Sequence, residues 1–286
     1  MATLRTIKRR IASVRSTQQI TNAMKMVAAA KLRKAQMRLT STRPYAHELG
    51  QVVGHVAARS KRKLHPLLEW REPKRVCYLL VTADRGLCGS FNANLIRHAQ
   101  IEWEQSEASK KYMITIGRKG YDHFRRRNFP IVAHYLDLFN NLQFEQAQAI
   151  ASELMRFYLK KRFDRIYVIY NEFKTAVQQK IVVEQFLPIE PVVPEQERFA
   201  TGIVFEPNAD AILRELCPKS LNVQMWRILL ESSASEFGAR MTAMETATDN
   251  ADEMIRELVL YYNKARQAAI TKELNEIVSG AEALKG

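Results

Sequence analysis

The chain has 286 residues, 47% of them hydrophobic and 26% charged, and its formal net charge is +14. This composition is ordinary for a globular protein that buries a core, and it excludes collagen-like and low-complexity chains. No apolar run reaches the length of about 18 residues that a membrane-spanning helix needs.

Cysteine and histidine usage indicates neither a disulfide framework nor a metal site. The three cysteines are irregularly spaced, and an odd count favours a reducing compartment. The six histidines are scattered, without the paired spacing that zinc ligands show. We therefore expect no metal ion and no bound cofactor.

The positive charge is concentrated at the start of the chain. Residues 1–75 hold 18 Lys and Arg but only three acids, Glu48, Glu69 and Glu72. The remaining residues are nearly balanced, with 26 basic and 27 acidic side chains. Such a stripe suits a nucleic-acid binder, and equally a helix that runs past an acidic protein surface.

The first segment, residues 1–58, is predicted to be a long helix, because it is dense in good helix formers. At about 1.5 Å per residue it would be roughly 80 Å long and would protrude from a compact domain. Pro44 is expected to kink or restart it. A seam with steps of three and four runs along it: Leu4, Ile7, Ile11, Val14, Gln18, Thr21, Lys25, Ala28, Leu32, Ala35 and Leu39.

The central segment, residues 74–206, alternates between short apolar runs and helical patterns. Strands are predicted at 76–82, 112–117, 131–133, 164–171, 180–187 and 202–205, and helices at about 91–107, 118–127 and 143–162. This alternation predicts a mostly parallel, Rossmann-like sheet. The proline-rich stretch that begins at Pro188 and continues to Arg198 is predicted to be a mobile loop.

The last segment, residues 208–286, is again predicted to be helical, with Asn208 as the N-cap. We expect Cys217-Pro218 to interrupt it and the helix to resume near Lys219. Its seam comprises Met241, Met244, Thr248, Ala251, Ile255, Leu258, Tyr262, Ala265 and Ala269. Two long helices with matching narrow stripes are expected to wind on each other as a left-handed coiled coil. The fold class is therefore α/β, a helical coiled coil plus a central Rossmann-like α/β domain.

The turn after the first central strand, residues 82–90, is the place where a phosphate would be held. It lacks the full glycine fingerprint and the Lys-Ser/Thr of a Walker loop, and the next strand ends in Gly117-Arg118-Lys119 with no acid for a ribose. A tight structural turn is favoured over nucleotide binding. Asp84 and Arg85 are candidates for an ion pair within this turn.

No catalytic group is predicted. Cys88 and Ser90 have no neighbouring His or acid in an order known for nucleophilic catalysis. Two rival functions remain open. A nucleic-acid binder would need aromatic residues, or Asn and Gln, interleaved with its arginines on one exposed face, and the first 43 residues contain no aromatic residue. A Rossmann-like enzyme with helical arms would be stabilised by added nucleotides.

Four motifs resemble the gamma subunits of F-type ATP synthases. Residues 7–36 are similar to the opening helix of that family, and residues 82–92 (TADRGLCGSFN) and 241–251 (MTAMETATDNA) also fit. Residues 270–284 (ITKELNEIVSGAEAL) match its C-terminal signature, including Thr271, Glu273, Glu276, Gly280 and Ala281. The resemblance covers the chain from end to end and favours the bacterial type.

The resemblance implies a central rotor shaft that is not itself a catalyst. The terminal helices would form an antiparallel coiled coil inside a ring of three alpha and three beta subunits. The α/β body would bind the epsilon subunit and the membrane ring of c subunits. The complex would lie on the inner membrane, with this chain peripheral on the cytoplasmic side and no nucleic acid involved. Ion flow would turn the shaft and drive the beta sites through their states in turn.

The resemblance also implies contact residues, each in a matching motif. The beta-subunit contacts would be Met24, Lys25, Arg240, Arg266, Gln267, Thr271 and Glu273. Glu206, before Pro207, would lie where the body approaches the c-ring and the epsilon subunit. The basic N-terminal helix would be attracted to acidic levers on beta.

Overall fold

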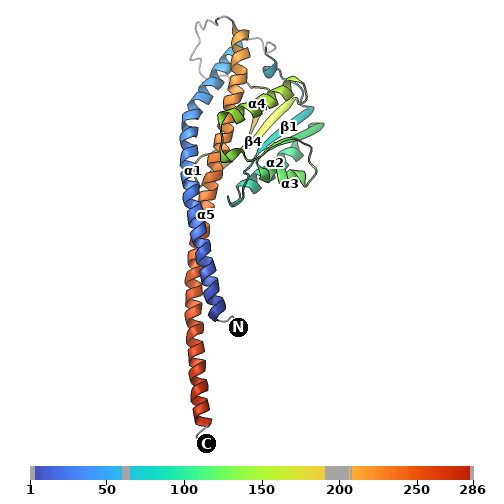
Figure 1. Cartoon of the computed structure of the whole chain (residues 1–286). Helices are drawn as coiled ribbons and strands as arrows, with labels where there is room; N and C mark the ends of the chain where they lie inside the picture. Colours follow the sequence, from blue (N-terminus) through green and yellow to red (C-terminus); the bar gives the residue numbers. More distant parts are fainter. Residues whose placement is uncertain (1–3, 60–64, 191–205, 207, 284–286) are drawn as a thin grey trace. The chain divides into compact units, whose positions relative to one another are not determined.

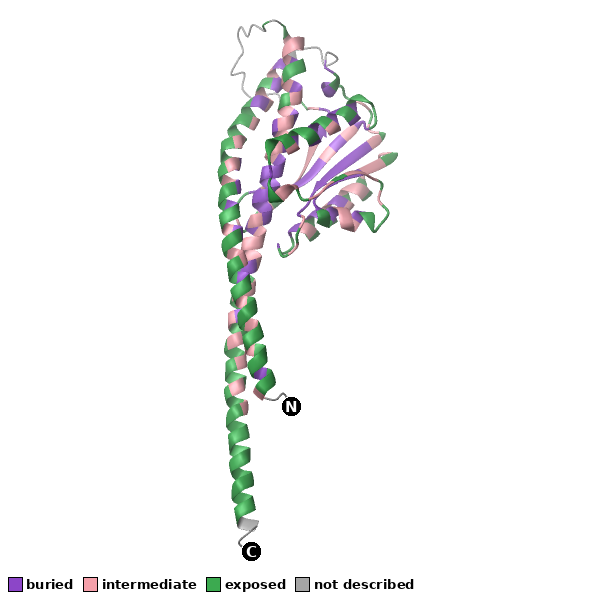
Figure 2. Ribbon diagram, in the orientation of Figure 1, coloured by how far each residue is buried: buried purple, intermediate pink, exposed green. Residues whose placement is uncertain are grey.

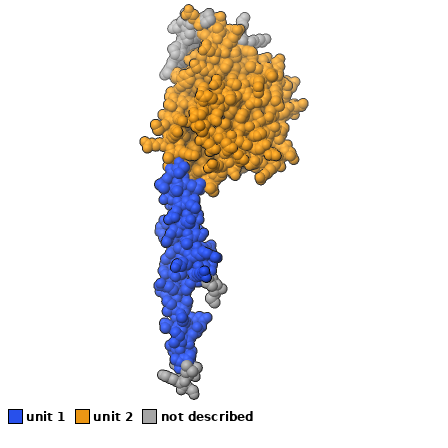
Figure 3. Space-filling view, viewed as in Figure 1, with its two compact units in different colours: residues 1–27, 241–286 blue, residues 28–240 orange. Residues whose placement is uncertain are grey.

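The computed structural model describes residues 4–59, 65–190, 206 and 208–283. The chain divides into two compact units (Figure 3): residues 28–240 form one, and residues 1–27 with 241–286 form the other. Two long helices, α1 (Leu4–Arg59) and α5 (Ala209–Ala283), contribute residues to both units. Among the described residues, no helix is both long and apolar enough to cross a membrane.

The larger unit is built on a five-stranded sheet in the order β3-β2-β1-β4-β5. Its strands are β1 (Arg75–Val81), β2 (Lys110–Ile116), β3 (Ile131–Tyr135), β4 (Arg165–Phe173) and β5 (Gln179–Leu187). Four of them are parallel, and β5 pairs antiparallel with β4. The predicted Rossmann-like α/β sheet is confirmed. Each of the five corresponding strands is found within three residues of its predicted bounds, and the predicted strand 202–205 lies outside the described residues.

Helices cover both faces of this sheet (Figure 1). The helices α2 (Phe91–Gln105) and α3 (Arg118–Arg125) lie on one face, and α4 (Phe144–Leu159) lies on the other. Alternate side chains of β1 point in opposite directions, so Tyr78 and Leu80 join the core beneath α2. Two 3-10 turns, η1 (Pro66–Leu68) and η2 (Leu138–Asn140), complete the described elements of the body. The predicted mobile loop lies outside the described residues from position 191 onward.

Both long helices continue through their prolines, so the predicted interruption at Cys217-Pro218 is wrong, and of the kink or restart predicted at Pro44 the restart is wrong. Pro44 lies within α1 and Pro218 within α5. Pro44 is exposed, so water can bond the carbonyl that loses its partner. Buried neighbours such as Leu49 and Leu221 hold the flanking turns in place, and this packing outweighs the loss of one backbone bond. The predicted N-cap is confirmed, because Asn208 Oδ1 accepts the Ala211 N–H at 2.9 Å.

The smaller unit pairs residues 4–27 of α1 with residues from 241 of α5 in antiparallel fashion. Gln18 bonds Asp252 at 2.6 Å, Thr248 bonds Thr21 at 2.8 Å, and Lys25 pairs with Glu245 at 2.8 Å. Every predicted seam position from Leu4 to Lys25, and from Met241 to Ala265, is buried or half-buried. Figure 2 shows this stripe of purple and pink positions. The predicted seam is wrong only at Ala269, which is exposed.

An ion pair at the amino ends of β1 and β4 predicts how stability changes in acid. Arg75 donates to both oxygens of Asp164, at 2.8 and 3.2 Å, and its backbone N–H adds a third bond at 2.8 Å. Burial pushes the pKa of Asp164 up, but the bonds from Arg75 outweigh it and the pKa lies below its usual value. The carboxylate therefore stabilises the fold above the unfolded pKa, and this contribution is lost as the pH falls through the folded pKa.

We expect Asp164→Asn to lower the free energy of unfolding at pH 7, and to matter less as the pH falls toward 2, because the ionic contribution is lost as the carboxyl of the folded wild type becomes protonated. Removing one partner of a largely buried ionic bond costs about 1–3 kcal/mol. Urea denaturation at both pH values checks this. An equal loss of stability at pH 7 and pH 2 would contradict the ionic origin. Glu72→Gln, in an ion pair whose side chains are about 70% exposed, is the control and should change little at either pH.

Candidate functional site

The carboxyl end of the sheet, where related architectures bind ligands, is covered by α5. Strand order reverses between β1 and β4, and open α/β sheets bind ligands beyond the carboxyl ends of the strands at such a point. Here α5 lies across it. Ser235 donates to the Asn171 carbonyl at 3.1 Å, and Gly238 lies so close to Ala176 that an added Cβ would be 3.1 Å from its carbonyl oxygen. A nucleotide would have to displace this helix.

The turn after β1 is a structural turn, as the sequence indicates. Asp84 Oδ1 accepts the backbone N–H groups of Arg118 and Asp137 at 3.1 and 3.0 Å. It therefore holds the ends of β2 and β3, and the ion pair predicted between Asp84 and Arg85 is not formed. Thr82 Oγ1 accepts the Gly120 N–H and donates to the Ile116 carbonyl. Every polar group named here serves the backbone rather than a substrate.

The thiols are not activated. Cys88 is buried, its Sγ accepts the Asn92 side chain at 3.2 Å, and burial raises its pKa. Burial also raises the pKa of Cys77 and takes that of Cys217 to about 12. A thiol in this state is a poor nucleophile, since the thiolate is the reactive form. Among the described residues, no group of three or more His, Cys, Asp or Glu is placed to hold a metal ion.

Two ion pairs that sequence reasoning missed join the long helices to the sheet. Glu231 of α5 has a side chain only 2% exposed and accepts Nε and Nη2 of Arg43, at 2.8 and 2.9 Å. It also accepts the backbone N–H of Phe173 at 2.9 Å. Arg227 bonds both oxygens of Glu184 at 2.8 Å. Neither pair has a helical or strand spacing, because the partners come from different elements, so no sequence signal marks them.

The predicted contact residues of the helix pair differ in how far they are engaged within the chain. Met24 is half-buried, and Lys25 is half-buried in its pair with Glu245. Arg240 is 12% exposed, bonds Glu236 at 2.6 Å, and donates to the Gly86 carbonyl at 3.2 Å. Burial raises the pKa of Glu236 against the pull of Arg240. The charged groups of Lys25 and Arg240 thus already have partners inside the chain.

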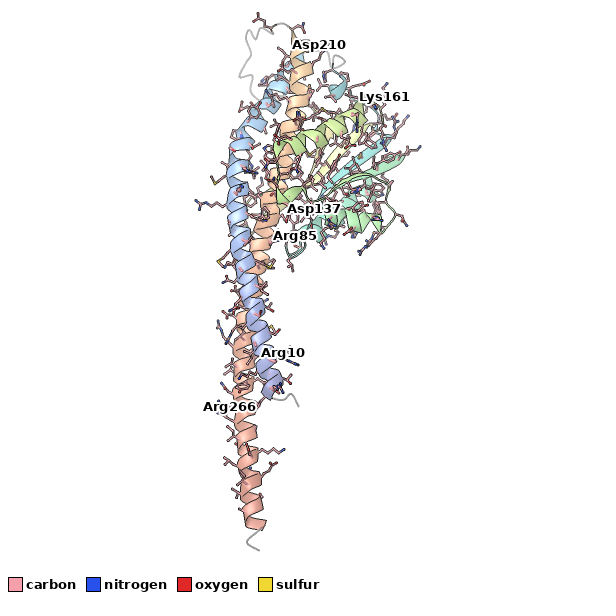
Figure 4. All side chains as sticks on the ribbon, in the orientation of Figure 1. Arg10, Arg85, Asp137, Lys161, Asp210 and Arg266 are labelled. Carbon is pink, nitrogen blue, oxygen red and sulfur yellow. The ribbon has the colours of Figure 1, made fainter. Side chains whose placement is uncertain are left out.

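The remaining predicted contacts lie free on the surface. Arg266, Gln267, Thr271 and Glu273 follow one another along exposed turns of α5, and Figure 4 labels Arg266. Thr271 donates back to the Gln267 carbonyl at 2.9 Å. Glu206 is also exposed. The structure therefore gathers four of the predicted contacts on one stretch of helix, and it places Glu206 in the other unit.

The same stretch of α5 carries apolar side chains that the sequence reasoning did not single out. Ile270, Leu274, Ile277 and Val278 are 50–62% exposed. In the antiparallel register, Leu4 of α1 lies opposite about Arg266, and every residue from 266 to 281 is exposed. The signal that would have found this surface is the spacing of 270, 274 and 277, which places three apolar side chains on one side of the helix beyond the paired region.

Comparisons with known proteins agree over the whole chain. A family profile described as ATP synthase matches residues 3–284. An ATP synthase gamma chain of Geobacter sp. strain M21 is 48% identical over 288 residues, covering 100% of both chains. One from Anaeromyxobacter sp. strain Fw109-5 is 49% identical over 290 residues, again covering 100% of each.

Solved structures show the same architecture. The central stalk and c-ring structure of the Tetrahymena thermophila mitochondrial ATP synthase includes a chain that is 27% identical, with a TM-score of 0.62 and coverage of 80% of this chain and 99% of that one. A chain of the Euglena gracilis mitochondrial ATP synthase shares the fold at 21% identity, with a TM-score of 0.70 and coverage of 98% and 94%. With motifs, fold and relatives in agreement, the chain belongs to the ATP synthase gamma chain family.

Proposed function

We propose that this chain is the central-stalk rotor of an F-type ATP synthase. It couples rotation of an ion-driven c-ring to the conformational cycle of catalytic beta subunits, and it supplies no catalytic group of its own. The observation that carries the proposal is the stretch of α5 from residue 266 to residue 281. It is exposed around its whole circumference and nevertheless presents Ile270, Leu274 and Ile277 on one side.

A single helix of this kind is expected to be completed by a partner. Most helical stability in proteins comes from packing an apolar face, and in this stretch of α5 the apolar side chains are exposed. Burying Ile270, Leu274 and Ile277 would contribute about 1.5–3 kcal/mol for each side chain. A ring of alpha and beta subunits around this helix would supply that surface.

Rotation can act on a catalytic site only through contacts that differ between its conformations. Arg266, Gln267, Thr271 and Glu273 would provide such contacts with beta, since their polar groups are exposed. Lys25 and Arg240 would exchange their internal partners Glu245 and Glu236 for carboxylates on beta, and Met24 would pack beside them. Exposed Lys8, Arg9 and Arg10 would favour an acidic surface at many rotational angles.

The remaining partners and the location follow from the same proposal. The body, residues 74–206, would bind the epsilon subunit and the c-ring, with Glu206 facing them. The coiled coil would comprise residues 1–58 and 208–286. The chain would be peripheral on the cytoplasmic side of the inner membrane, held there by the c-ring. The gamma chain relatives and the central-stalk likeness support this arrangement.

Substituting both Arg266 and Gln267 by alanine should impair coupling without unfolding the chain. A hydrogen bond to a charged group contributes about 1.5–3 kcal/mol, so losing one in the assembled complex should slow ATP-driven ion pumping about tenfold or more. Both side chains are exposed, so the unfolding midpoint of the chain should stay unchanged. The measurement is ATP hydrolysis and ion pumping by the complex reconstituted into vesicles.

Lys264→Ala is the matched control, because Lys264 is exposed on the same turn and is not a predicted contact. It should leave pumping intact. Equal pumping by the double variant and the control would remove Arg266 and Gln267 from the proposed contact. Purification of the tagged chain from its native membrane without alpha and beta subunits would overturn the proposed function itself.

A further inference from the structure

A small hollow opens within the unit of residues 28–240, between α1, α5 and the turn that contains η2. Its volume is about 150 Å³. Its polar lining consists of three cations, two amides and one hydroxyl: Lys31, Lys34, Arg38, Asn140, Asn141 and Ser233. No carboxylate lines it, and the rest of the wall is apolar. Fixed positive charge beside an apolar wall attracts anions more strongly than it would in open water.

The three cations of this hollow are not neutralised by the chain. Lys31 lies 5.5 Å from the centre of the Phe237 ring, and Arg38 Nη1 donates to the Leu142 carbonyl at 3.1 Å. Within the described part of the chain, neither they nor Lys34 has a carboxylate at ion-pair distance. The positive charge of Lys31 acts on the carboxylate of Glu236, but that carboxylate is already bonded to Arg240 at 2.6 Å.

Neutral donors complete the hollow. Ser233 is only 5% exposed, and it lines the hollow with a hydroxyl that can donate a hydrogen bond. Asn141 accepts the Gln143 side chain through Oδ1 at 2.9 Å, which leaves its own N–H groups available. Donors therefore outnumber acceptors around this hollow, as is typical of sites that hold oxyanions.

A larger cavity in the same unit shows the opposite balance. It measures about 570 Å³ and also contains two arginines, Arg43 and Arg227. There each guanidinium faces a carboxylate, Glu231 or Glu184, at 2.8 Å. Its positive charge is thus used within the fold. The uncompensated charge of the smaller hollow is a property of that site and does not follow from the basic composition of the chain.

We propose that this hollow is a binding site for a doubly charged oxyanion of the size of inorganic phosphate. Lys34 and the free Nη2 of Arg38 provide charge, and Ser233 and the two asparagines provide directed donors. Pockets for ligands of nucleotide size measure roughly 300–1,000 Å³, so a whole nucleotide does not fit here. The site is independent of the proposed rotor function, because all its residues come from this chain.

The test is the unfolding midpoint of the full chain as phosphate replaces chloride at constant ionic strength. Binding to the folded state raises the midpoint and saturates. In Lys34→Gln the phosphate concentration for half the effect should rise about tenfold, which is the loss of one charge-assisted bond. Arg33→Gln is the matched control, because Arg33 is the exposed neighbour on α1, carries the same charge and does not line the hollow. It should respond like the wild type.

Three outcomes would overturn the assignment. Equal weakening by Lys34→Gln and Arg33→Gln would show attraction to a diffuse positive surface. An unchanged half-effect concentration in Ser233→Ala, which keeps every charge, would show that the anion lies outside the hollow. Saturation by acetate at the same concentration as phosphate would identify a carboxylate site, of the kind that an acidic side chain of a partner could fill.

Discussion

Replacing Arg43 by methionine is expected to lower the free energy of unfolding of the unit of residues 28–240 by about 3 kcal/mol, the lower end of the range for buried pairs, because it leaves a buried carboxylate without its charged partner while Arg43 itself is 43% exposed. Glu231 has a side chain 2% exposed, and two of its bonds come from Arg43. Methionine keeps the helical propensity and much of the side-chain volume of Arg43. The decrease in the free energy of unfolding therefore measures the loss of the guanidinium group and its bonds. Urea denaturation followed by tryptophan fluorescence measures it, since all three tryptophans, at positions 70, 103 and 226, lie in this unit.

The double variant Arg43→Met with Glu231→Leu separates the two origins of that loss. Replacing both members of a buried ion pair by apolar groups is often neutral, so the double variant should recover most of the stability. Two smaller costs remain, because the Phe173 N–H loses its acceptor and the Phe173 carbonyl loses the bond from Arg43. A double variant less stable than Arg43→Met would contradict this. Arg33→Met, at an exposed position of the same helix, should change stability by less than about 0.5 kcal/mol.

Gly117→Ala is expected to destabilise the body by about 4 kcal/mol or more, the range of exceptional single substitutions. Gly117 directly follows β2 and has a φ of +89°, where residues with side chains are strained. An added Cβ would lie 2.0 Å from the Thr82 carbonyl oxygen, so either the backbone of β1 or that of β2 must move. This is also where Thr82 donates to Ile116 and Gly117 to Tyr135, both at 2.8 Å. The same urea experiment measures the effect.

Gly50→Ala is the opposite control. Gly50 lies inside α1, and a Cβ there would meet nothing within 4 Å. Alanine in a helix interior is favoured over glycine by about 0.5–1 kcal/mol, so this variant should be more stable than the wild type. A Gly117→Ala protein as stable as the wild type would show that the turn can adopt another backbone path, and the packing described for Thr82 would then be wrong.

Local patterns were sufficient wherever a residue's role depends on its near neighbours in the chain. The seam from Leu4 to Lys25 and its counterpart from Met241 to Ala265 were predicted from steps of three and four, because helix geometry alone decides which side chains share a face. The strands followed from apolar runs in the same way. The N-cap at Asn208 is likewise a local property, set by one side chain and an N–H three residues on.

Prediction from sequence failed where tertiary packing competes with a local preference. Pro44 and Pro218 each break one backbone bond, and the sequence alone suggested a kink or restart at Pro44 and an interruption at Pro218. Burial of neighbours such as Leu49 and Cys217 contributes more than that bond, so the helices continue. Similarly, Asp84 bonds the backbone of Arg118 and Asp137, which are distant in sequence, instead of its neighbour Arg85.

The sequence by itself determined the α/β body, the two long helices, their matching seams and, through its motifs, the family. These are properties of periodicity and composition, which a chain carries before it folds. Only the tertiary structure decided what fills the end of the sheet, which arginines are neutralised and which part of α5 is left exposed. Each of these depends on which distant residues meet, and a pair such as Arg43 and the buried Glu231 exists only once α1, α5 and β4 have packed together.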